Sequence, residues 1–348
     1  MSKKTLLSIL ALMTILVSLV GCAQSQSPAA SSTSAPQAPA ATPTAAKQFK
    51  VGLISPGPVH DKGWNELAYQ GIKLIEKEMG AKVSYVEVGD SPTEYEKAFT
   101  DYASQGYDFV IAHGYQFQDA MEKVAPQFPK TVFVTSGGVK YGPNYGPMIM
   151  RQEEAFYLLG VIATNMTKTG KAVGIGGQDI PAISGPFAGF KQGFETVPGH
   201  TFSVTYINNW TDLGAAKEAG LAAFADGADF EIPNANIAGL GVFQAAQEKK
   251  FWAFGANGDQ SSEAPDQILA SSVLDYPKAF LTMAKSIQNG TYKGNQITSY
   301  GLKDPGIVYI TYNDKLKSQI PADVLAKVDD AQKKIISGEI QVSGTYIK

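Results

Sequence analysis

The stretch GPVHDKGWNELAYQG, residues 57–71, follows an apolar run at 49–54 and leads into a segment with apolar residues at positions 67, 72, 75 and 79. The run predicts a buried strand, and the apolar positions share one face of a predicted helix. The stretch therefore lies at the carboxyl end of a strand, which is where open α/β sheets bind their ligands.

The same stretch carries side chains that suit a small planar ligand. Trp64 offers a flat aromatic face, and Asp61 and Asn65 offer hydrogen-bonding groups beside it. This mixture combines stacking with recognition of a ligand's polar edge. A second interpretation stays open, in which Asp61 or Asn65 caps the helix and Trp64 packs as a hydrophobic staple.

Strand-like and helix-like patterns alternate along the rest of the chain. The segments predicted as strands are 49–54, 82–88, 109–112, 131–135, 172–176, 202–207, 228–232, 251–255 and 268–273. The segments predicted as helices after the first are about 93–105, 116–127, 155–166, 187–197, 214–225 and 239–249. Because parallel strands need crossovers that are usually helices, the alternation predicts an α/β fold with two doubly wound parallel-sheet lobes. Two such lobes around a hinged cleft resemble type I periplasmic binding proteins.

The first residues of the sequence predict a targeting signal. Two lysines precede an apolar run from Leu6 to Val20, which is typical of a secretory signal peptide over residues 1–21. Cys22 follows in a string that looks like the bacterial lipobox, and it is the chain's one cysteine. Diacylation of Cys22 would supply two acyl chains, enough for stable membrane anchoring. Residues 22–47 are rich in Ala, Ser, Pro and Thr and are expected to form a lipidated, disordered tether.

The remaining residues suit two domains. We expect one lobe to comprise 48–150 plus about 275–310, and the other to comprise 151–274 plus about 311–348. The net charge is −3, and the basic residues are dispersed. The sequence therefore does not predict a nucleic-acid interface, which would need a clustered basic face.

Four stretches together resemble the basic membrane protein family, which comprises substrate-binding lipoproteins of ABC importers and includes purine nucleoside receptors. They are GPVHDKGWNELAYQG at 57–71, HGYQFQDA at 113–120, NIAGLGVFQAA at 236–246 and FGANGDQSSEAPDQILAS at 254–271. A fifth stretch, NNWTDLGAAKEA at 208–219, resembles the segment after the central strand of the second lobe. The resemblance implies capture of a small ligand outside the cell and its delivery to a membrane permease and ATPase. It also implies no cofactor, and we expect a monomer.

The resemblance implies a set of ligand-binding residues. The expected residues are Asp61, Trp64, Asn65, Tyr115, Phe117, Asp119, Phe187, Trp210, Asn236, Gly239, Asn257 and Asp259. For Phe117 and Phe187, core packing is an equally open interpretation.

Two departures from the family pattern bear on the ligand. Nucleoside-binding members have a carboxylate that contacts ribose where this chain has Asn257, and a lysine often stands where it has Leu274. An amide binds a hydroxyl less strongly than a charged acceptor does. A purine base or another planar ligand therefore stays open beside a nucleoside.

Two other classes of function stay open. The sequence lacks a complete dinucleotide fingerprint, a Walker A string and an HExxH motif. A hydrolase that cleaves nucleosides or glycosides would use Asp61 and Asp119 as its acid and base, if their separation allowed it. His60 and His113 fall at two expected cleft loops, where each would act in catalysis or as a neutral hydrogen-bonding group. The second class is a lipoprotein that senses a ligand without feeding a permease.

Overall fold

The structure is a computed structural model that describes residues 47–60 and 64–344. The described residues belong to one compact unit. The predicted signal peptide, Cys22 and Asp61 lie outside the described residues, so the predictions made for them stay predictions.

The first lobe is built on a six-stranded sheet in which all neighbouring strands run parallel. In spatial order, its strands are β11 (Thr298–Tyr300), β5 (Tyr145–Met150), β4 (Val132–Ser136), β3 (Phe109–Ala112), β1 (Lys50–Ser55) and β2 (Lys82–Glu87). Side chains alternate between the two faces of a strand. In β1, Val51 and Leu53 therefore pack against one helix layer, whereas Ile54 packs against the other.

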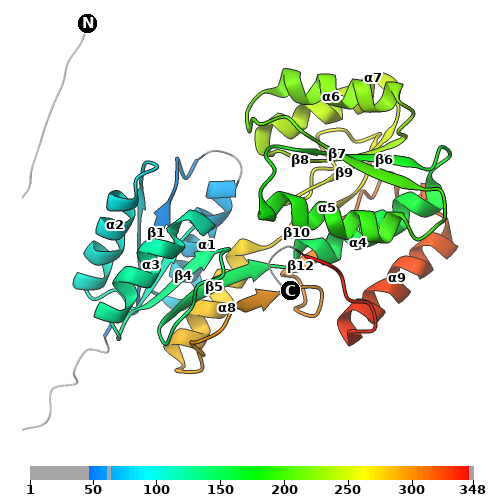
Figure 1. The fold of residues 1–348 in the computed structure, drawn as a ribbon. Helices are drawn as coiled ribbons and strands as arrows, with labels where there is room; N and C mark the ends of the chain where they lie inside the picture. Colours follow the sequence, from blue (N-terminus) through cyan, green and yellow to red (C-terminus); the bar gives the residue numbers. More distant parts are fainter. Residues whose placement is uncertain (1–46, 61–63, 345–348) are drawn as a thin grey trace, which may run out of the picture. The chain divides into compact units, whose positions relative to one another are not determined.

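Helices cover both faces of this sheet (Figure 1). Helices α1 (Trp64–Met79) and α8 (Tyr276–Gln288) pack together on one face, although they lie about 200 residues apart in the chain. Helices α2 (Pro92–Ser104) and α3 (Gln118–Val124) cover the other face. Both faces are thus covered, which explains why the central strands β1, β3 and β4 are buried and largely apolar.

The second lobe repeats this arrangement. Its sheet has the strand order β12 (Val308–Tyr312), β10 (Ile268–Leu274), β9 (Trp252–Gly255), β8 (Phe230–Asn234), β6 (Lys171–Gly176) and β7 (Thr201–Tyr206). The edge strand β12 is antiparallel to β10, and the others are parallel. Figure 1 shows this sheet between α6 (Leu213–Ala225) and α7 (Leu240–Lys249) on one side and α4 (Gln152–Met166), α5 (Pro181–Phe194) and α9 (Ala322–Ser337) on the other.

The strand order of each sheet creates one point where a ligand site is favoured. In the first sheet the order reverses between β1 and β3, and in the second it reverses between β6 and β8. At such a switch point the connections leave on opposite faces, which opens a crevice at the carboxyl ends of the strands. The loops after β1, β3, β6 and β8 are therefore the ones that position a site.

The predicted fold class is confirmed, with differences in detail. Helix α5 begins at Pro181, six residues before its predicted start, because proline is favoured in a helix's first turn. Strand β8 covers 230–234 instead of 228–232. Strand β11 and helix α8 belong to the first lobe, and β12 and α9 belong to the second. The exact lobe boundaries stay a prediction.

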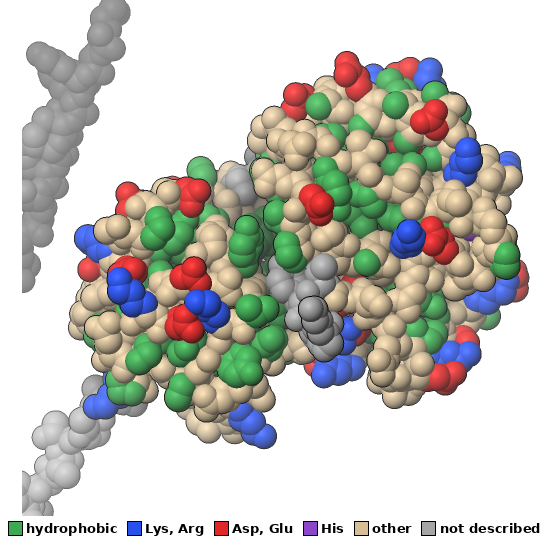
Figure 2. Space-filling model, in the orientation of Figure 1, with side chains coloured by type: hydrophobic (Ala, Val, Ile, Leu, Met, Phe, Trp, Pro, Cys, Tyr) green, Lys and Arg blue, Asp and Glu red, His purple; other side chains and the backbone are tan. Residues whose placement is uncertain are grey.

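Two surface properties of the described residues bear on function. None of their helices is both long enough and apolar enough to cross a bilayer. On the face seen in Figure 2, Lys and Arg side chains are interspersed with Asp and Glu, and no large patch of one sign gathers there.

Candidate ligand-binding site

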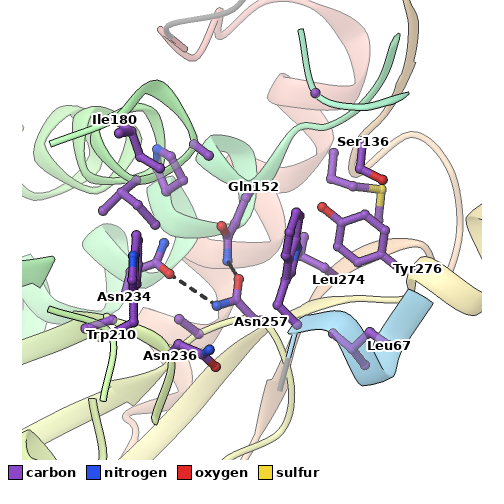
Figure 3. A pocket seen from close by; sticks show the side chains of 18 of the residues that line it. Leu67, Ser136, Gln152, Ile180, Trp210, Asn234, Asn236, Asn257, Leu274 and Tyr276 are labelled. Atoms are coloured by element: carbon purple, nitrogen blue, oxygen red, sulfur yellow. Dashed lines mark hydrogen bonds between the residues drawn. The ribbon is translucent and has the colours of Figure 1, made fainter. Parts of the chain in front are cut away.

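A cavity of about 1090 Å³ opens at the strand ends identified above, and both lobes line it. Small-molecule sites usually measure about 300–1,000 Å³, so the cavity has room for a ligand of nucleoside size. Figure 3 shows Leu67, Ser136 and Tyr276 on one side of the cavity and Ile180, Trp210 and Asn234 on the other. Gln152 and Asn257 lie between them.

On the first-lobe side, Trp64 presents an indole to the cavity. It is the first residue of α1, and one of its faces stacks on the ring of His113 at 3.6 Å between centroids and 28° between planes. Tyr276 meets Trp64 edge-on at 6.4 Å. The hydroxyl of Tyr276 accepts a hydrogen bond from the indole N–H, which limits the rise that burial causes in the pKa of Tyr276. The position of the Trp64 indole is therefore fixed by His113 on one face and by Tyr276 at one edge.

His113 follows β3 and is completely buried. Its Nδ1 lies 2.8 Å from the Ser136 hydroxyl, and its Nε2 lies 3.0 Å from the carbonyl oxygen of Trp64. Burial lowers the pKa of His113 to about 3, and the hydrogen bond to Trp64 only partly opposes this shift. The ring is therefore neutral at physiological pH.

On the second-lobe side, Trp210 presents the other indole. Its six-membered ring lies so close to Gly177 that a Cβ at that position would come within 2.3 Å of it. Gly177 directly follows β6, at the switch point of the second sheet. The absence of a side chain at Gly177 therefore lets the indole approach the backbone.

A relay of three amides from the second lobe runs from Asn234 toward the middle of the cavity. Nε2 of Gln152 donates to Oδ1 of Asn257 at 3.0 Å, and Nδ2 of Asn257 donates to Oδ1 of Asn234 at 3.1 Å (Figure 3). Gln152 and Asn234 are buried, at 4% and 3% exposed. Asn257 has φ +70°, a conformation that asparagine tolerates better than most residues. These groups offer a ligand neutral donors and acceptors.

Comparison with known proteins identifies the family. A family model described as "Bmp: ABC transporter substrate-binding protein PnrA-like" matches residues 48–345. The chain belongs to the Bmp family.

Among curated relatives of this Bmp protein, basic membrane protein A1 of Borrelia garinii is 28% identical over 305 residues, covering 84% of this chain and 88% of the relative. A purine-binding protein of Brucella abortus is 28% identical over 299 residues, covering 85% of this chain and 83% of the relative. The family is one of substrate-binding proteins of ABC transporters, not of enzymes.

Solved structures support the fold. A solute-binding protein of an ABC transporter from Aeropyrum pernix superposes with a TM-score of 0.72 at 23% identity, covering 84% of this chain and 92% of that one. A second, from Conexibacter woesei, gives 0.70 at 23% identity and covers 86% and 100%. At this identity the match shows the two-lobed binding-protein fold.

The structure brings most of the predicted site residues of the Bmp protein to the cavity. Those that line it are Trp64, Asn65, Tyr115, Trp210, Asn236, Gly239, Asn257 and Asp259. The Asp259 carboxylate also accepts hydrogen bonds from the backbone N–H and the hydroxyl of Ser261, so part of its capacity is used locally. Whether these residues bind a ligand stays a prediction.

Three predicted site residues lie elsewhere and require correction. Phe117 is fully buried and packs at 4.4 Å from Tyr95, because its short 3₁₀ turn presents Tyr115 to the cavity instead. Asp119 lies on α3 with its side chain 80% exposed, 3.0 Å from Nζ of Lys140. Phe187 is 1% exposed in the second lobe's core, where its ring packs against Phe156 and Phe202.

Other cavity residues were not predicted from the sequence. The main ones are Ser136, Gln152, Glu153, Ile180, Asn234 and Tyr276. Ser136 and Asn234 are the last residues of β4 and β8, so applying the strand-end rule to every strand would have found them. Gln152 and Tyr276 begin helices at crossings between the lobes, where no local pattern marks a site. Among the described residues, no cluster of three His, Cys, Asp or Glu is arranged to hold a metal ion.

Proposed function

We propose that this Bmp protein captures a purine base or nucleoside outside the cell and delivers it to the permease and ATPase of an ABC importer. The observation that carries the proposal is the pair of indoles, Trp64 from the first lobe and Trp210 from the second, that line a single cavity. Aromatic faces stack well on planar heterocycles. The Brucella abortus relative is named as a purine-binding protein, which supports the same class of ligand.

The amide relay supports recognition of a heterocycle's edge. Amides supply both donors and acceptors, as a purine edge requires, and a site built on such groups rejects analogues that leave them unpaired. Nothing in the relay is charged, and Asn257 replaces the carboxylate that the family resemblance associates with ribose. A sugar should therefore add less affinity here than in nucleoside receptors.

Titration calorimetry with adenine, guanine, hypoxanthine, their nucleosides and simple hexoses tests the ligand. We expect purines to bind and to raise the melting temperature, as any ligand of the native state does by mass action. Hexoses should not bind, because each of their many hydroxyls requires a hydrogen-bond partner. The two indoles that line the cavity instead present apolar faces. Binding of a hexose without any purine signal would overturn the ligand proposal.

The matched variant Asn257→Asp tests the contribution of the sugar. Its carboxylate can still accept from Gln152, and Asn234 can turn its amide to donate to it. We expect the affinity for adenosine relative to adenine to increase, by up to about tenfold for one charge-assisted hydrogen bond.

We also propose that Cys22 is the acylation site that anchors the protein on the extracytoplasmic face of the membrane. The proposal rests on the apolar run and lipobox-like string of the sequence. Expression of the full chain with Cys22→Ser tests it, since this variant should be shed or left unprocessed while it keeps its purine affinity. Unchanged membrane retention would contradict the anchor.

The hydrolase alternative loses support from the position of Asp119. Its carboxylate is exposed on α3 and pairs with Lys140, and it does not line the cavity. Incubation of the protein with nucleosides should therefore release no free base.

A further inference from the structure

The feature that carries a further inference is the chain of contacts Trp64–His113–Ser136. His113 is 0% exposed, and both of its ring nitrogens have a partner among the described residues. One partner, the Trp64 carbonyl oxygen, can only accept a hydrogen bond. His113 Nε2 must therefore carry the ring's proton.

The tautomer of His113 fixes the direction of its second hydrogen bond. A neutral imidazole carries one proton, so Nδ1 of His113 is bare and can only accept. The Ser136 hydroxyl, 2.8 Å away, must then be the donor. Its single proton points at His113.

Ser136 also lines the cavity, at the carboxyl end of β4. A serine hydroxyl that is free to rotate offers a ligand either its proton or its lone pairs. With its proton committed to His113, Ser136 offers lone pairs alone. A ligand acceptor placed there would face another acceptor, whereas a ligand N–H or O–H would be satisfied.

We propose that His113 sets the hydrogen-bond polarity of Ser136, so that Ser136 selects ligands that present an N–H or O–H donor to this side of the cavity. His113 is a positioning residue, and Ser136 is the group that contacts the ligand. The ligand class in this inference rests on the proposed function, whereas the polarity of Ser136 does not.

The polarity also depends on the packing around His113. Tyr276 and Phe280 meet the imidazole edge-on at 5.1 and 6.1 Å, and Trp64 covers one face. These rings surround an imidazole that is 0% exposed, so its two hydrogen bonds select the Nε2–H tautomer without a charged partner. A role limited to supporting the Trp64 indole would need only the ring and not its nitrogens.

The first experiment determines the tautomer of His113 in the purified protein. The chain has three histidines, so ¹H–¹⁵N long-range correlation spectra can be assigned by comparison with His113→Phe. We expect the Nε2–H form at every pH from 5 to 8. A proton on Nδ1, or titration of His113 within that range, would overturn the proposal. This measurement needs no ligand.

The second experiment measures donor selection by calorimetry. The probes are adenine, purine, 9-methyladenine and hypoxanthine, which differ in their exocyclic and ring N–H groups. In the wild type we expect the loss of one donor to weaken binding by about tenfold or more, since an unpaired buried group costs about 1–3 kcal/mol. The penalty for that donor should shrink to about threefold or less in Ser136→Ala.

Two variants of His113 separate positioning from support. His113→Phe keeps an aromatic ring behind Trp64 but lacks an acceptor for Ser136, so the donor penalty should shrink as in Ser136→Ala. His113→Gln can accept from Ser136 and donate to the Trp64 carbonyl, so it should restore the penalty. If His113→Phe keeps the full wild-type penalty, the ring only supports Trp64 and the proposal fails. If the wild type binds none of the probes, the proposed function fails. The measured tautomer of His113 then remains as the test of the hydrogen-bond polarity of Ser136.

Discussion

At the scale of single residues, the two faces of Trp64 have different surroundings. One face packs on His113, and the other side of the residue lines the cavity. The two interpretations of Trp64 drawn from the sequence, a ligand platform and a packed staple, are therefore compatible in one side chain. A substitution at Trp64 should affect both binding and stability.

We expect Trp64→Ala to lose about 1–3 kcal/mol of purine binding, the range for stacking of a base on an aromatic ring. It should also lower the melting temperature, because it uncovers the buried imidazole behind the indole. Calorimetry and thermal unfolding followed by circular dichroism measure the two effects. Trp64→Phe is the control and should keep most of both. Wild-type affinity in Trp64→Ala would show that the indole does not stack on the ligand.

A substitution at Gly177 tests the role of the Trp210 indole without changing a residue that lines the cavity. A methyl group at this position would come within 2.3 Å of Trp210, so Gly177→Ala should displace the indole and weaken purine binding by about tenfold or more. Gly214→Ala is the matched control, since its added Cβ meets only an oxygen of the Asp212 side chain at 3.3 Å. Equal affinities for the two variants would contradict a role of Trp210 in binding.

At the scale of elements, strand β8 carries an unusual buried acid. Glu231 is 0% exposed, and neither carboxylate oxygen has a hydrogen-bond partner among the described residues. Strand alternation points it toward α6 and α7, where Gly220 leaves room for its carboxylate. Burial raises the pKa of Glu231 to about 9, so the native protein holds it protonated at neutral pH.

This shift makes stability depend on pH. A raised native pKa stabilises the fold fully below the unfolded value of 4.5, and this stabilisation is lost as the pH rises toward 9. His113 acts in the opposite sense between its native pKa of about 3 and its usual 6.5, because only its unfolded form takes up a proton there. Above pH 7 the free energy of unfolding should therefore change with pH through Glu231 and not through His113.

We expect the free energy of unfolding of the wild type to fall by roughly 2 kcal/mol between pH 7 and 8.5, at about 1.4 kcal/mol per pH unit. Glu231→Gln should remove this fall, because a glutamine does not titrate. Urea denaturation at the two pH values measures it. Glu218→Gln, which removes an exposed charge from α6, is the control and should behave like the wild type. A fall of the same size in Glu231→Gln would mean that another group is responsible.

The elements also show how far the sequence alone predicts the structure. Buried strands appear as apolar runs, so most strands and the α/β class could be predicted. Helix α5 begins at Pro181 and contains Pro186, whereas the sequence predicted a helix near 187–197. Phe187 was assigned to the site by the family resemblance, and only the packing of α5 on the sheet shows that it is buried. Gln152 and Tyr276 could not be found, because they reach the cavity only when two distant segments of the chain come together.

At the scale of the whole molecule, the chain passes between the two sheets after β5, after β10 and after β11. The first and third crossings are tied together. The backbone N–H of Arg151 donates to the carbonyl of Tyr300 at 2.7 Å, and Oε2 of Glu154 accepts from the N–H of Leu302 at 2.8 Å. The joint between the lobes is thus a hydrogen-bonded structure that begins one residue before Gln152 of the cavity.

Arg151 neutralises two buried carboxylates at this joint. Its guanidinium lies 3.0 Å from Oε1 of Glu153 and 3.1 Å from Oε1 of Glu154, whose side chains are 8% and 9% exposed. Burial raises the pKa of Glu153, and the hydrogen bond from Arg151 opposes that rise. Without Arg151 the two carboxylates would remain buried without their cationic partner.

We therefore expect Arg151→Met to lower the free energy of unfolding at pH 7 by roughly 3–5 kcal/mol, the usual cost of removing one partner from a buried ion pair. The loss should be smaller at pH 5, because a raised native pKa favours proton uptake by Glu153 as the pH falls toward the unfolded value of 4.5. The double variant Arg151→Met/Glu153→Gln should regain part of the stability at pH 7, since it removes one of the unpaired charges. Urea denaturation of the wild type, both variants and Glu153→Gln at pH 5 and 7 measures these differences. Equal losses at the two pH values, with no recovery in the double variant, would mean that Arg151 acts at the joint through packing and not through charge.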